Sequence, residues 1–310
     1  INALFTQSDD TLWAMGDNGY GQLGDGTTTD HADPIQVATD VADVSAGSFH
    51  MTYAKLDGST WVAGGNQSGQ WGDGSYFKRT RPVQIDYDTI QVSAGPNHTL
   101  YLQADGGLWA MGNNQYGTLG DGTTDTRTLP VRVATDVISI SAGDSHSLYV
   151  KSDGTLWGMG YNQGRLGDGT AITRVSPIQI ASHVIKASAG AGHSLFLKED
   201  GSLWGMGYNG KGELGDGTTI DRNTPVPIAT GVVEFSAGNQ FSLFLKSDGG
   251  LWATGNNSNG QLGDGTKDNR SFPVHVAADV VAVDAGSNNS LFVTSDGKLW
   301  AMGSNDNGKS

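Results

Sequence analysis

Short runs of alternating apolar and small or polar residues recur along the whole chain. Residues 147–151 (SLYVK) and 155–159 (TLWGM) flank a Ser-Asp-Gly tripeptide. Two β-prone runs around Asp-Gly predict a β-hairpin. Residues 137–143 (VISISAG) precede it and predict a strand that ends on small side chains, where backbones crowd together. A fourth short strand is expected around residues 177–180, at a sheet edge because Pro177 lacks an N–H.

This unit of four short strands is copied along the chain. Residues 161–170 hold three glycines and predict an irregular segment between the hairpin and the fourth strand. No amphipathic helix is indicated anywhere. The string Leu-Trp-Ala-Met-Gly, or a close variant, occurs seven times, and its tryptophans are spaced by 48 residues except for one interval of 47. These tryptophans are Trp13, Trp61, Trp109, Trp157, Trp204, Trp252 and Trp300.

Four-stranded units at this period are typical of the blades of a β-propeller. We therefore expect an all-β protein, a seven-bladed propeller of four-stranded blades that forms a single domain over residues 1–310. An open solenoid is the rival architecture, but ring closure explains better why neither end carries a polar cap. The hairpin occurs seven times, whereas the Leu-Gly-Asp-Gly segment and the strand ending in Ala-Gly occur six times each.

The chain thus consists of six full repeats of about 48 residues with half repeats at its ends. We expect the last blade to be built from both termini and to lack about two strands. The alternative is a natural chain that continues beyond Ser310.

Composition and charge exclude several classes of function. No apolar run approaches the roughly 18 residues of a membrane-spanning helix, so no membrane span is expected. Cysteine is absent, which excludes disulfides and thiolate chemistry. The net charge is −14 and the 18 Lys and Arg are scattered, so we expect no nucleic-acid partner. Most of the acidic charge comes from Asp-Gly turns, because only three of the 32 acidic residues are Glu.

One combined pattern runs through the repeats. It reads Asn-x-x-Gly-x-Leu-Gly-Asp-Gly, then Pro, then Ser-Ala-Gly-x-x-His-Ser-Leu-x-x-x-Ser-Asp-Gly-x-Leu-Trp, and residues 162–169, Pro177, 188–193 and 195–204 show it clearly. This pattern resembles the regulator of chromosome condensation repeat over essentially the whole chain. The resemblance implies a seven-bladed propeller. Members of that family include a nucleotide exchange factor, a plant ultraviolet photoreceptor, a proteinaceous β-lactamase inhibitor and many extracytoplasmic bacterial proteins.

The chain departs from the exchange factor that it resembles. That protein carries an insertion that wedges into its GTPase and a basic tail, and neither is present here, so an exchange-factor-like regulator is disfavoured. The uniform repeat rich in Leu-Gly-Asp-Gly-Thr looks most like the secreted or surface versions of the family. We therefore expect a bacterial protein located outside the cell or on its surface.

Two rings of repeated polar residues are candidates for metal or ligand binding. The position eleven residues before each Trp holds Asn2, His50, His98, His146, His193, Phe241 and Asn289. Equivalent atoms of neighbouring blades are too far apart to share a metal ion, so each His is expected to hydrogen bond a neighbouring turn and to fix its blade. Asp25, Asp73, Asp121, Asp168, Asp216 and Asp264 form the second ring. Calcium binding is one interpretation, and capping of backbone N–H groups is the favoured one.

Residues that break the repeat are the better functional candidates. Trp71 replaces the Leu of Leu-Gly-Asp-Gly, and Tyr76 and Phe77 follow where other repeats have Thr and Asp. The two residues before each His position also vary, and loops of one class emerge at one propeller face. Neutral drift at exposed positions is the alternative. The predicted binding residues are Phe49, His50, Trp71, Tyr76, Phe77, Asn97, His98, Asp144, His146, His193, Gln240, Phe241, Asn288 and Asn289.

No unique set of acid, base and nucleophile stands out, and no cofactor fingerprint is present. We therefore expect a monomeric, non-enzymatic scaffold without cofactor or metal, which recognises or inhibits an extracellular protein partner through loops on one face. A lectin or calcium-binding propeller with repeated small-ligand pockets is the alternative class. A hydrolase or lyase with an acid/base pair at the channel mouth is the third.

Overall fold

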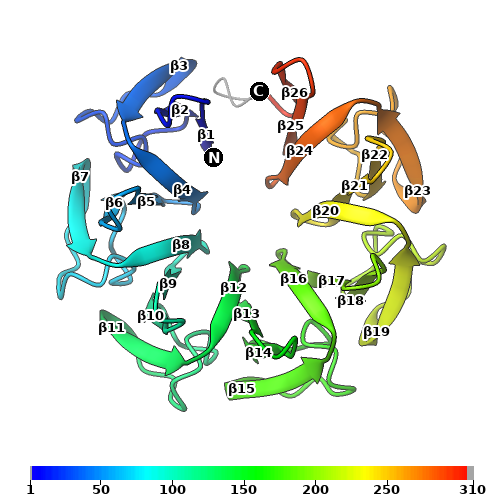
Figure 1. Cartoon of the computed structure of the whole chain (residues 1–310), viewed down its shortest axis with the longest axis horizontal. Coiled ribbons are helices and arrows are strands. Elements are labelled where there is room, and N and C mark those ends of the chain that lie inside the picture. The colour runs from blue at the N-terminus through cyan, green and yellow to red at the C-terminus, as the bar shows by residue number, and fades with distance from the viewer. Residues whose placement is uncertain (1, 306–310) are drawn as a thin grey trace.

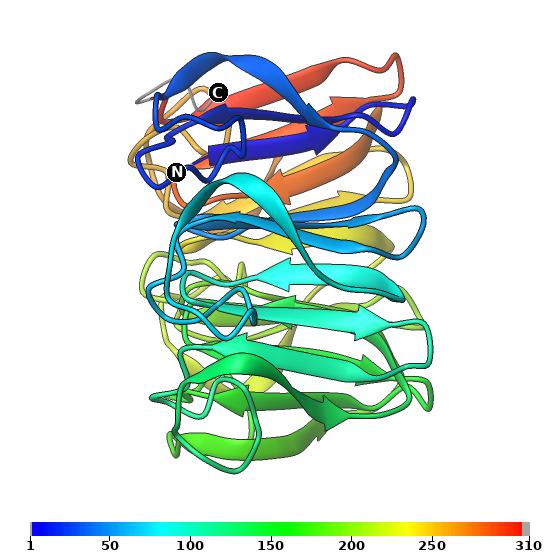
Figure 2. The same ribbon diagram turned by 90° about the vertical axis from the view of Figure 1, so that its left-hand side faces the viewer.

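The structure is a computed structural model that describes residues 2–305, in which 26 β-strands form seven sheets. The sheets stand around a central axis like the blades of a propeller (Figure 1). Seen from the side, the strands run between the two faces of the ring (Figure 2). No helix among these residues has the length and apolar character that a membrane span requires.

The strands fall into seven sheets in chain order. The first contains β1 (Asn2–Thr6), β2 (Leu12–Gly16) and β3 (His31–Ala38). The second contains β4 (Val41–Ala46), β5 (His50–Lys55), β6 (Thr60–Gly64) and β7 (Arg79–Asp86), and the third β8 (Thr89–Ala94), β9 (His98–Gln103), β10 (Leu108–Gly112) and β11 (Arg127–Ala134). The fourth contains β12 (Val137–Ala142), β13 (His146–Lys151), β14 (Leu156–Gly160) and β15 (Arg174–Ala181).

The remaining sheets repeat the same order. The fifth contains β16 (Val184–Ala189), β17 (His193–Lys198), β18 (Leu203–Gly207) and β19 (Arg222–Ala229). The sixth contains β20 (Val232–Ala237), β21 (Phe241–Lys246), β22 (Leu251–Gly255) and β23 (Arg270–Ala277). The seventh contains β24 (Val280–Ala285), β25 (Asn289–Thr294) and β26 (Leu299–Gly303).

Each complete blade therefore consists of an inner strand, a hairpin and an outer strand, paired antiparallel in that order. This confirms the predicted all-β, seven-bladed propeller and its incomplete last blade. The expected blade shared by both termini is not formed among residues 2–305, because each end forms a sheet of its own. The first sheet has no inner strand and the seventh has no outer strand, so within residues 2–305 the two ends form separate three-stranded sheets.

The hydrophobic core lies between consecutive blades. Leu100 and Leu108 of the third blade pack against Val137, Ile140 and Tyr149 of the fourth, and similar clusters fill the other blade interfaces. Six of the repeated tryptophans are half-buried and Trp300 is exposed. Five of the seven stack on an aromatic side chain of the adjacent strand. Apolar positions of the repeat thus build the fold by joining blades.

Small residues at the ends of the inner strands meet at the axis. A Cβ on Gly143 would come within 2.7 Å of the Gly190 carbonyl oxygen, which only glycine avoids. The Ser93 hydroxyl accepts a hydrogen bond of 2.9 Å from the Ala142 N–H of the next blade, and four equivalent bonds link other inner strands. The crowding predicted from Ser-Ala-Gly is confirmed, and its serines tie neighbouring blades together.

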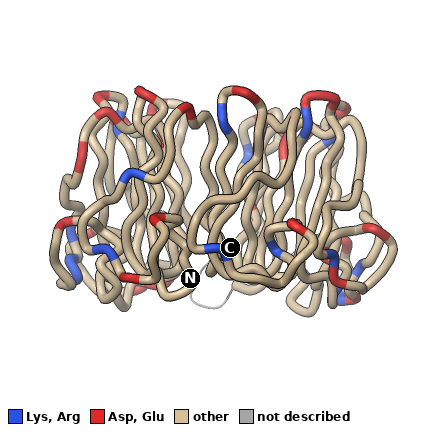
Figure 3. Tube along the Cα trace, turned by 90° about the horizontal axis from the view of Figure 1, so that it is seen from below, with Lys and Arg blue, Asp and Glu red and all other residues tan. Residues whose placement is uncertain are grey.

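The two faces of the ring carry different connections. Hairpin turns and the turns between outer and inner strands hydrogen bond to each other on one face, as in Val137 N–H to Gly106 O at 3.0 Å. The Gly-rich loops and the Ala-Gly-x-x-His loops do so on the other, as in Tyr161 N–H to Ser145 O at 2.8 Å. We call these the turn face and the loop face. Acidic residues lie along both edges of the ring in Figure 3, of which the upper is the turn face.

Candidate functional site

The four repeated histidines are buried between blades. Nε2 of His50 lies 2.9 Å from Thr99 Oγ1 on the next blade. His98, His146 and His193 make the equivalent contact with a serine hydroxyl at 3.1, 2.8 and 2.9 Å. The expected structural role is confirmed, although the partner is a strand hydroxyl of the next blade and not a turn. Because these imidazoles are buried, a partner that binds the surface of the propeller cannot touch them.

The hydrogen bonds also define the protonation of these rings. The Thr99 hydroxyl donates to the Gln70 carbonyl at 2.7 Å, so His50 must donate from Nε2. Burial lowers the pKa of His50 to about 3, that of His98 and His193 to about 4, and that of His146 well below its usual range. The four rings are therefore neutral at physiological pH. Within residues 2–305 no three His, Asp or Glu side chains gather to hold a metal ion.

The aspartates of the Gly-Asp-Gly loops accept hydrogen bonds from residues of their own loops. Asp264 accepts hydrogen bonds from Thr266 N–H at 3.0 Å, Asn257 Nδ2 at 2.9 Å and Arg270 Nε at 2.7 Å. Burial raises the pKa of Asp264, but these hydrogen bonds outweigh that effect and lower it to about 2. The favoured interpretation of this ring, backbone capping, is confirmed, and four arginines at equivalent positions neutralise the buried carboxylates.

The candidates that break the repeat separate into core and surface residues. Trp71 is fully buried, as are the leucines that it replaces in other repeats, such as Leu23 and Leu119. This corrects the expectation that its indole lies on a binding loop: the Leu of Leu-Gly-Asp-Gly faces the core, and Trp71 inherits that position. Phe241 is fully buried at the His position. Asn2 and Asn289 are also buried.

The remaining candidates lie on the loop face. Asp144 and Gln240 are exposed, and Phe49, Asn97 and Asn288 are half-buried, all in the loops that precede the hairpins. Tyr76 and Phe77 are 56% and 76% exposed.

Phe49 belongs to an aromatic cluster with a lysine. Its ring meets Tyr20 edge-on at 5.0 Å between ring centroids, and Lys78 Nζ lies 6.0 Å from the Tyr20 centroid. Tyr76 and Phe77 directly precede Lys78 in the exposed loop. We call Tyr20, Phe49, Tyr76, Phe77 and Lys78 the lysine cluster. Three of its five members were predicted from the sequence as binding residues.

A second cluster was missed by sequence reasoning. Tyr116 and Tyr161 lie 5.0 Å apart between ring centroids, and Arg165 Cζ lies 4.7 Å from the Tyr161 centroid and 5.7 Å from that of Tyr208. Arg165 Nε donates to the Ala191 carbonyl at 3.3 Å, which holds the guanidinium between two tyrosines. We call Tyr116, Tyr161, Arg165 and Tyr208 the arginine cluster. Asp144 interacts electrostatically with its guanidinium.

The sequence did contain a signal for the arginine cluster. The single 47-residue interval falls between Trp157 and Trp204, and the missing residue belongs to the Gly-rich loop that carries Arg165. In this shortened loop Gln163 adopts a φ of 45°, which is uncommon for a residue other than glycine. Most other repeats place Gln at the Arg165 position, as in Gln22, Gln70 and Gln261. A deletion combined with an Arg substitution thus marked the loop that differs most.

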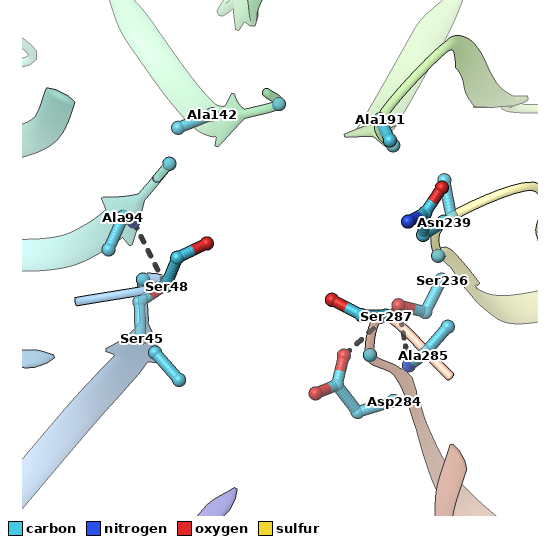
Figure 4. Close-up of a pocket in the computed structure, with 18 of the residues that line it drawn as sticks. Ser45, Ser48, Ala94, Ala142, Ala191, Ser236, Asn239, Asp284, Ala285 and Ser287 are labelled. Atoms are coloured by element: carbon cyan, nitrogen blue, oxygen red, sulfur yellow. Dashed lines mark hydrogen bonds between the residues drawn. The ribbon is translucent and has the colours of Figure 1, made fainter. Parts of the chain in front are cut away.

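A cavity of about 560 Å³ lies on the axis of the ring. Ser, Ala and Gly residues of the inner strands line it, and Ser48, Asn239 and Ser287 stand at the loops around it (Figure 4). Its walls offer hydroxyls and small apolar groups from six repeats. Among the described residues this lining contains two carboxylates, Asp144 and Asp284, and no His, Lys or Arg.

Comparison with known proteins identifies the family of this chain. The sequence model described as the RCC1-like domain matches residues 86–310, more than half of the chain. The chain belongs to the RCC1-like domain family. The model of the regulator of chromosome condensation (RCC1) repeat also matches residues 9–53. The family resemblance expected from the repeat pattern is confirmed.

Solved RCC1-like propellers share the fold at low identity. Human WBSCR16 is 21% identical, with a TM-score of 0.85 over 96% of this chain and 90% of its own. Prp20p from Saccharomyces cerevisiae is 19% identical, with a TM-score of 0.82 over 98% of this chain and 80% of its own. The same yeast protein bound to Kap60 has a TM-score of 0.84 at 19% identity and the same coverage. Similarity at this level establishes the architecture.

Proposed function

We propose that this RCC1-like domain is a non-enzymatic scaffold that binds a single protein partner through its loop face. The observation that carries the proposal is the pair of aromatic and cationic clusters on that face. Neither cluster is needed to build the repeat, because equivalent positions in other blades hold different residues, such as Asn97 for Phe49, Gln70 for Arg165 and Asn256 for Tyr208. Residues that the fold does not require are available for recognition.

The arginine cluster has the composition and rigidity of a binding hot spot. Tyr and Arg are enriched where protein partners bind most strongly. Arg165 is held by two tyrosine rings and by the Ala191 carbonyl, so less side-chain freedom is lost when a partner docks. Tyr116 and Tyr208 remain 39% and 46% exposed. The cluster thus combines an accessible apolar surface with one partly shielded positive charge.

Known members of the fold support a protein ligand. The yeast propeller Prp20p is described with binding properties toward Gsp1p and histones, and it has been solved bound to Kap60. For this chain we place the partner outside the bacterial cytoplasm, because its repeats look like those of secreted and surface members. We further propose that the chain acts as a monomer, in the manner of an inhibitor or a recognition module.

The test compares variants that restore the repeat consensus. Arg165→Gln and Tyr208→Asn introduce residues found at equivalent positions, such as Gln70 and Asn256, so folding is retained. Tyr87→Thr removes a tyrosine that is 64% exposed on the turn face, where Thr135 is the equivalent, and serves as the matched control. Proteins captured from native extract by the wild type and by each variant are quantified by mass spectrometry.

We expect one captured protein to be retained by Tyr87→Thr and reduced at least tenfold by both loop-face variants. Titration of that protein should give one partner per chain, because the two clusters occur once each. Equal capture by all four chains would refute the loop face as the binding site. Several small ligands bound per chain would instead indicate the repeated-pocket class.

A further inference from the structure

A groove of about 540 Å³ lies between the first and second blades. One side is formed by β3 and the residue after it, from Gln36 to Thr39. The other side is formed by residues of β5, β6 and β7, among them Lys55, Trp61 and Arg81. Among the described residues, none of β1 or of an inner strand contributes to the lining, so the groove belongs to the outer part of the ring.

The floor of this groove is continuous with the core between the two blades. Val37 and Ala38 pack with Tyr53 in the hydrophobic cluster that joins these blades. Trp61 stacks on Tyr53 with 6.4 Å between ring centroids, and its Nε1 donates to Ser59 Oγ at 2.8 Å. The indole is therefore held in place before a ligand arrives, which limits the entropy lost on binding.

The charged residues of the groove are cations without an acidic partner. Lys55 and Arg81 line it, whereas no Asp or Glu of the described residues does. Six of the eight arginines form an ion pair with an aspartate, as Arg127 does with Asp121 at 2.7 Å. Within residues 2–305 Arg81 forms no ion pair, and neither does Lys55. A cleft lined by one sign of charge attracts ligands of the other, so this groove favours an anion even in a chain of net charge −14.

Arg81 departs from the repeat. The equivalent positions of the other outer strands hold Asp33, Leu129, Ser176, Thr224 and Phe272. A Cβ on Gly26 would lie 2.9 Å from Arg81 Cζ, so the guanidinium lies over the backbone of the Gly-Asp-Gly loop of the first blade. The fold does not require an arginine here, which leaves its charge available for recognition.

The two cations stand toward opposite ends of the groove. Arg81 is the third residue of β7, which begins at the loop face, and Lys55 is the last residue of β5, which ends at the turn face. By the strand register Arg81 lies near the level of Met51, four residues before Lys55 and so roughly 13 Å from it along the strands. A ligand that contacts both cations is therefore elongated and carries more than one acidic group.

We propose that this groove binds a segment of a linear acidic polysaccharide, with one uronate carboxylate at Arg81, another at Lys55 and a sugar ring against Trp61. A guanidinium binds a carboxylate through two parallel N–H donors, and an ammonium attracts it as a point charge. Gln36 and Thr39 are exposed on the opposite side and offer an amide and a hydroxyl to the sugar hydroxyls. An indole beside such groups suits a sugar ring, which has an apolar C–H face and hydroxylated edges. The proposal does not rest on the proposed function, because it requires no partner on the loop face.

The test titrates trigalacturonate calorimetrically into the 310-residue chain. Its matched control is the trimethyl ester of the same trisaccharide, which keeps the hydroxyls and the sugar rings and removes the charge. We expect one trigalacturonate per chain and at least tenfold weaker binding of the ester. An acidic peptide is the alternative ligand, so acetylated and amidated Glu-Glu-Glu is titrated as well and should bind at least fivefold more weakly than trigalacturonate.

Variants that restore residues of the repeat locate the site. Arg81→Leu and Lys55→Gln introduce the residues found at the equivalent positions Leu129 and Gln103, so folding is retained. Each should weaken the binding of trigalacturonate at least fivefold, because each removes one of the two cations.

Lys246→Gln is the matched control in the sixth blade. Lys246 Nζ lies 4.9 Å from the Trp252 centroid, as Lys55 Nζ lies 5.8 Å from that of Trp61, but this variant should leave the binding of trigalacturonate unchanged. No binding, equal binding of the methyl ester or tighter binding of the peptide would each overturn the proposal. So would unchanged binding by Arg81→Leu, or a loss in Lys246→Gln as large as that in Lys55→Gln.

Discussion

His50 Nε2 donates to Thr99 Oγ1 at 2.9 Å, across the interface between the second and third blades. The same hydroxyl donates to the Gln70 carbonyl in the Gly-rich loop of the second blade at 2.7 Å. One buried hydroxyl therefore joins two hairpins and a loop. The relay recurs at three further interfaces, with Ser147, Ser194 and Ser242 in the place of Thr99.

Removal of this hydroxyl should destabilise the ring. Thr99→Val keeps the shape of the side chain but leaves the His50 N–H and the Gln70 carbonyl buried without a partner. Each such group costs about 1–3 kcal/mol, so we expect the free energy of unfolding to fall by about 2–6 kcal/mol. Ser290→Ala is the control, because Phe241 faces that hydroxyl and only the Gln261 carbonyl loses its partner. Denaturant unfolding measures both, and equal losses would contradict the relay.

Acidification should destabilise the protein through the buried histidines. In the folded state the pKa of His50 is about 3, that of His98 and His193 is about 4, and burial holds that of His146 well below 6.5, the value of the ordinary side chain. The unfolded chain therefore takes up protons that the folded chain does not, and stability is lost as pH falls below 6.5. Each ring contributes about 1.4 kcal/mol per pH unit. Asp43 acts in the opposite direction, because burial raises its pKa to about 6. Its effect on the free energy of unfolding cancels that of about one histidine.

The net expectation is a loss of stability as pH falls from 6 to 4, measured by urea unfolding at several pH values. The slope should stay below about 4 kcal/mol per pH unit, because burial also raises the pKa of Asp144 and Glu213. His193→Asn provides the control, because Asn occupies the same position as Asn2 and Asn289. It should reduce the slope by about 1.4 kcal/mol per pH unit. The aspartates of the Gly-Asp-Gly loops contribute only below pH 3.8, so a flat profile between pH 6 and 4 would contradict the neutral, buried state of the histidines.

Aromatic residues of one segment should respond differently to truncation. Trp71→Ala removes a fully buried side chain and should lower the free energy of unfolding by about 3–5 kcal/mol. Tyr76→Ala and Phe77→Ala remove exposed rings and should change it by no more than about 0.5 kcal/mol. Denaturant unfolding distinguishes the two cases. If Trp71→Ala were as stable as the wild type, the indole would not lie in the core.

Periodicity explains how far the fold was predictable. Residues that repeat with the tryptophans, such as Val137, Gly143 and His146, have equivalent positions in the other blades. The structure predicted for one repeat therefore applied to the others. Trp71 was misplaced because its aromatic chemistry was considered without its position in the repeat. The Leu of Leu-Gly-Asp-Gly is apolar in every copy, and this alone indicated a core site.

The arginine cluster could not be predicted from the sequence for a different reason. Tyr116, Tyr161 and Tyr208 belong to three different Gly-rich loops, and their approach to Arg165 depends on the curvature of the ring. Local patterns do not contain that curvature. That the first and last sheets do not join likewise depends on which strands meet in space.

Removal of calcium should leave the stability of the propeller unchanged. In a typical loop, Asp216 Oδ1 accepts from Thr218 N–H and Asn209 Nδ2 at 2.9 and 3.0 Å, and Oδ2 accepts from Arg222 Nε at 2.7 Å. A calcium ion would have to displace the arginine and repel its charge. A site filled at one hundred times its dissociation constant would add about 2.7 kcal/mol, which corresponds to several degrees in the unfolding midpoint. We therefore expect the unfolding midpoints in excess EDTA and in millimolar calcium to agree within about 1 °C.

Arg222→Gln is the informative variant, because loss of the guanidinium frees a carboxylate oxygen. Its unfolding midpoint should be lower than that of the wild type in EDTA, and calcium should not raise it. A rise with calcium in the wild type would show that the ring of aspartates is a cation site after all.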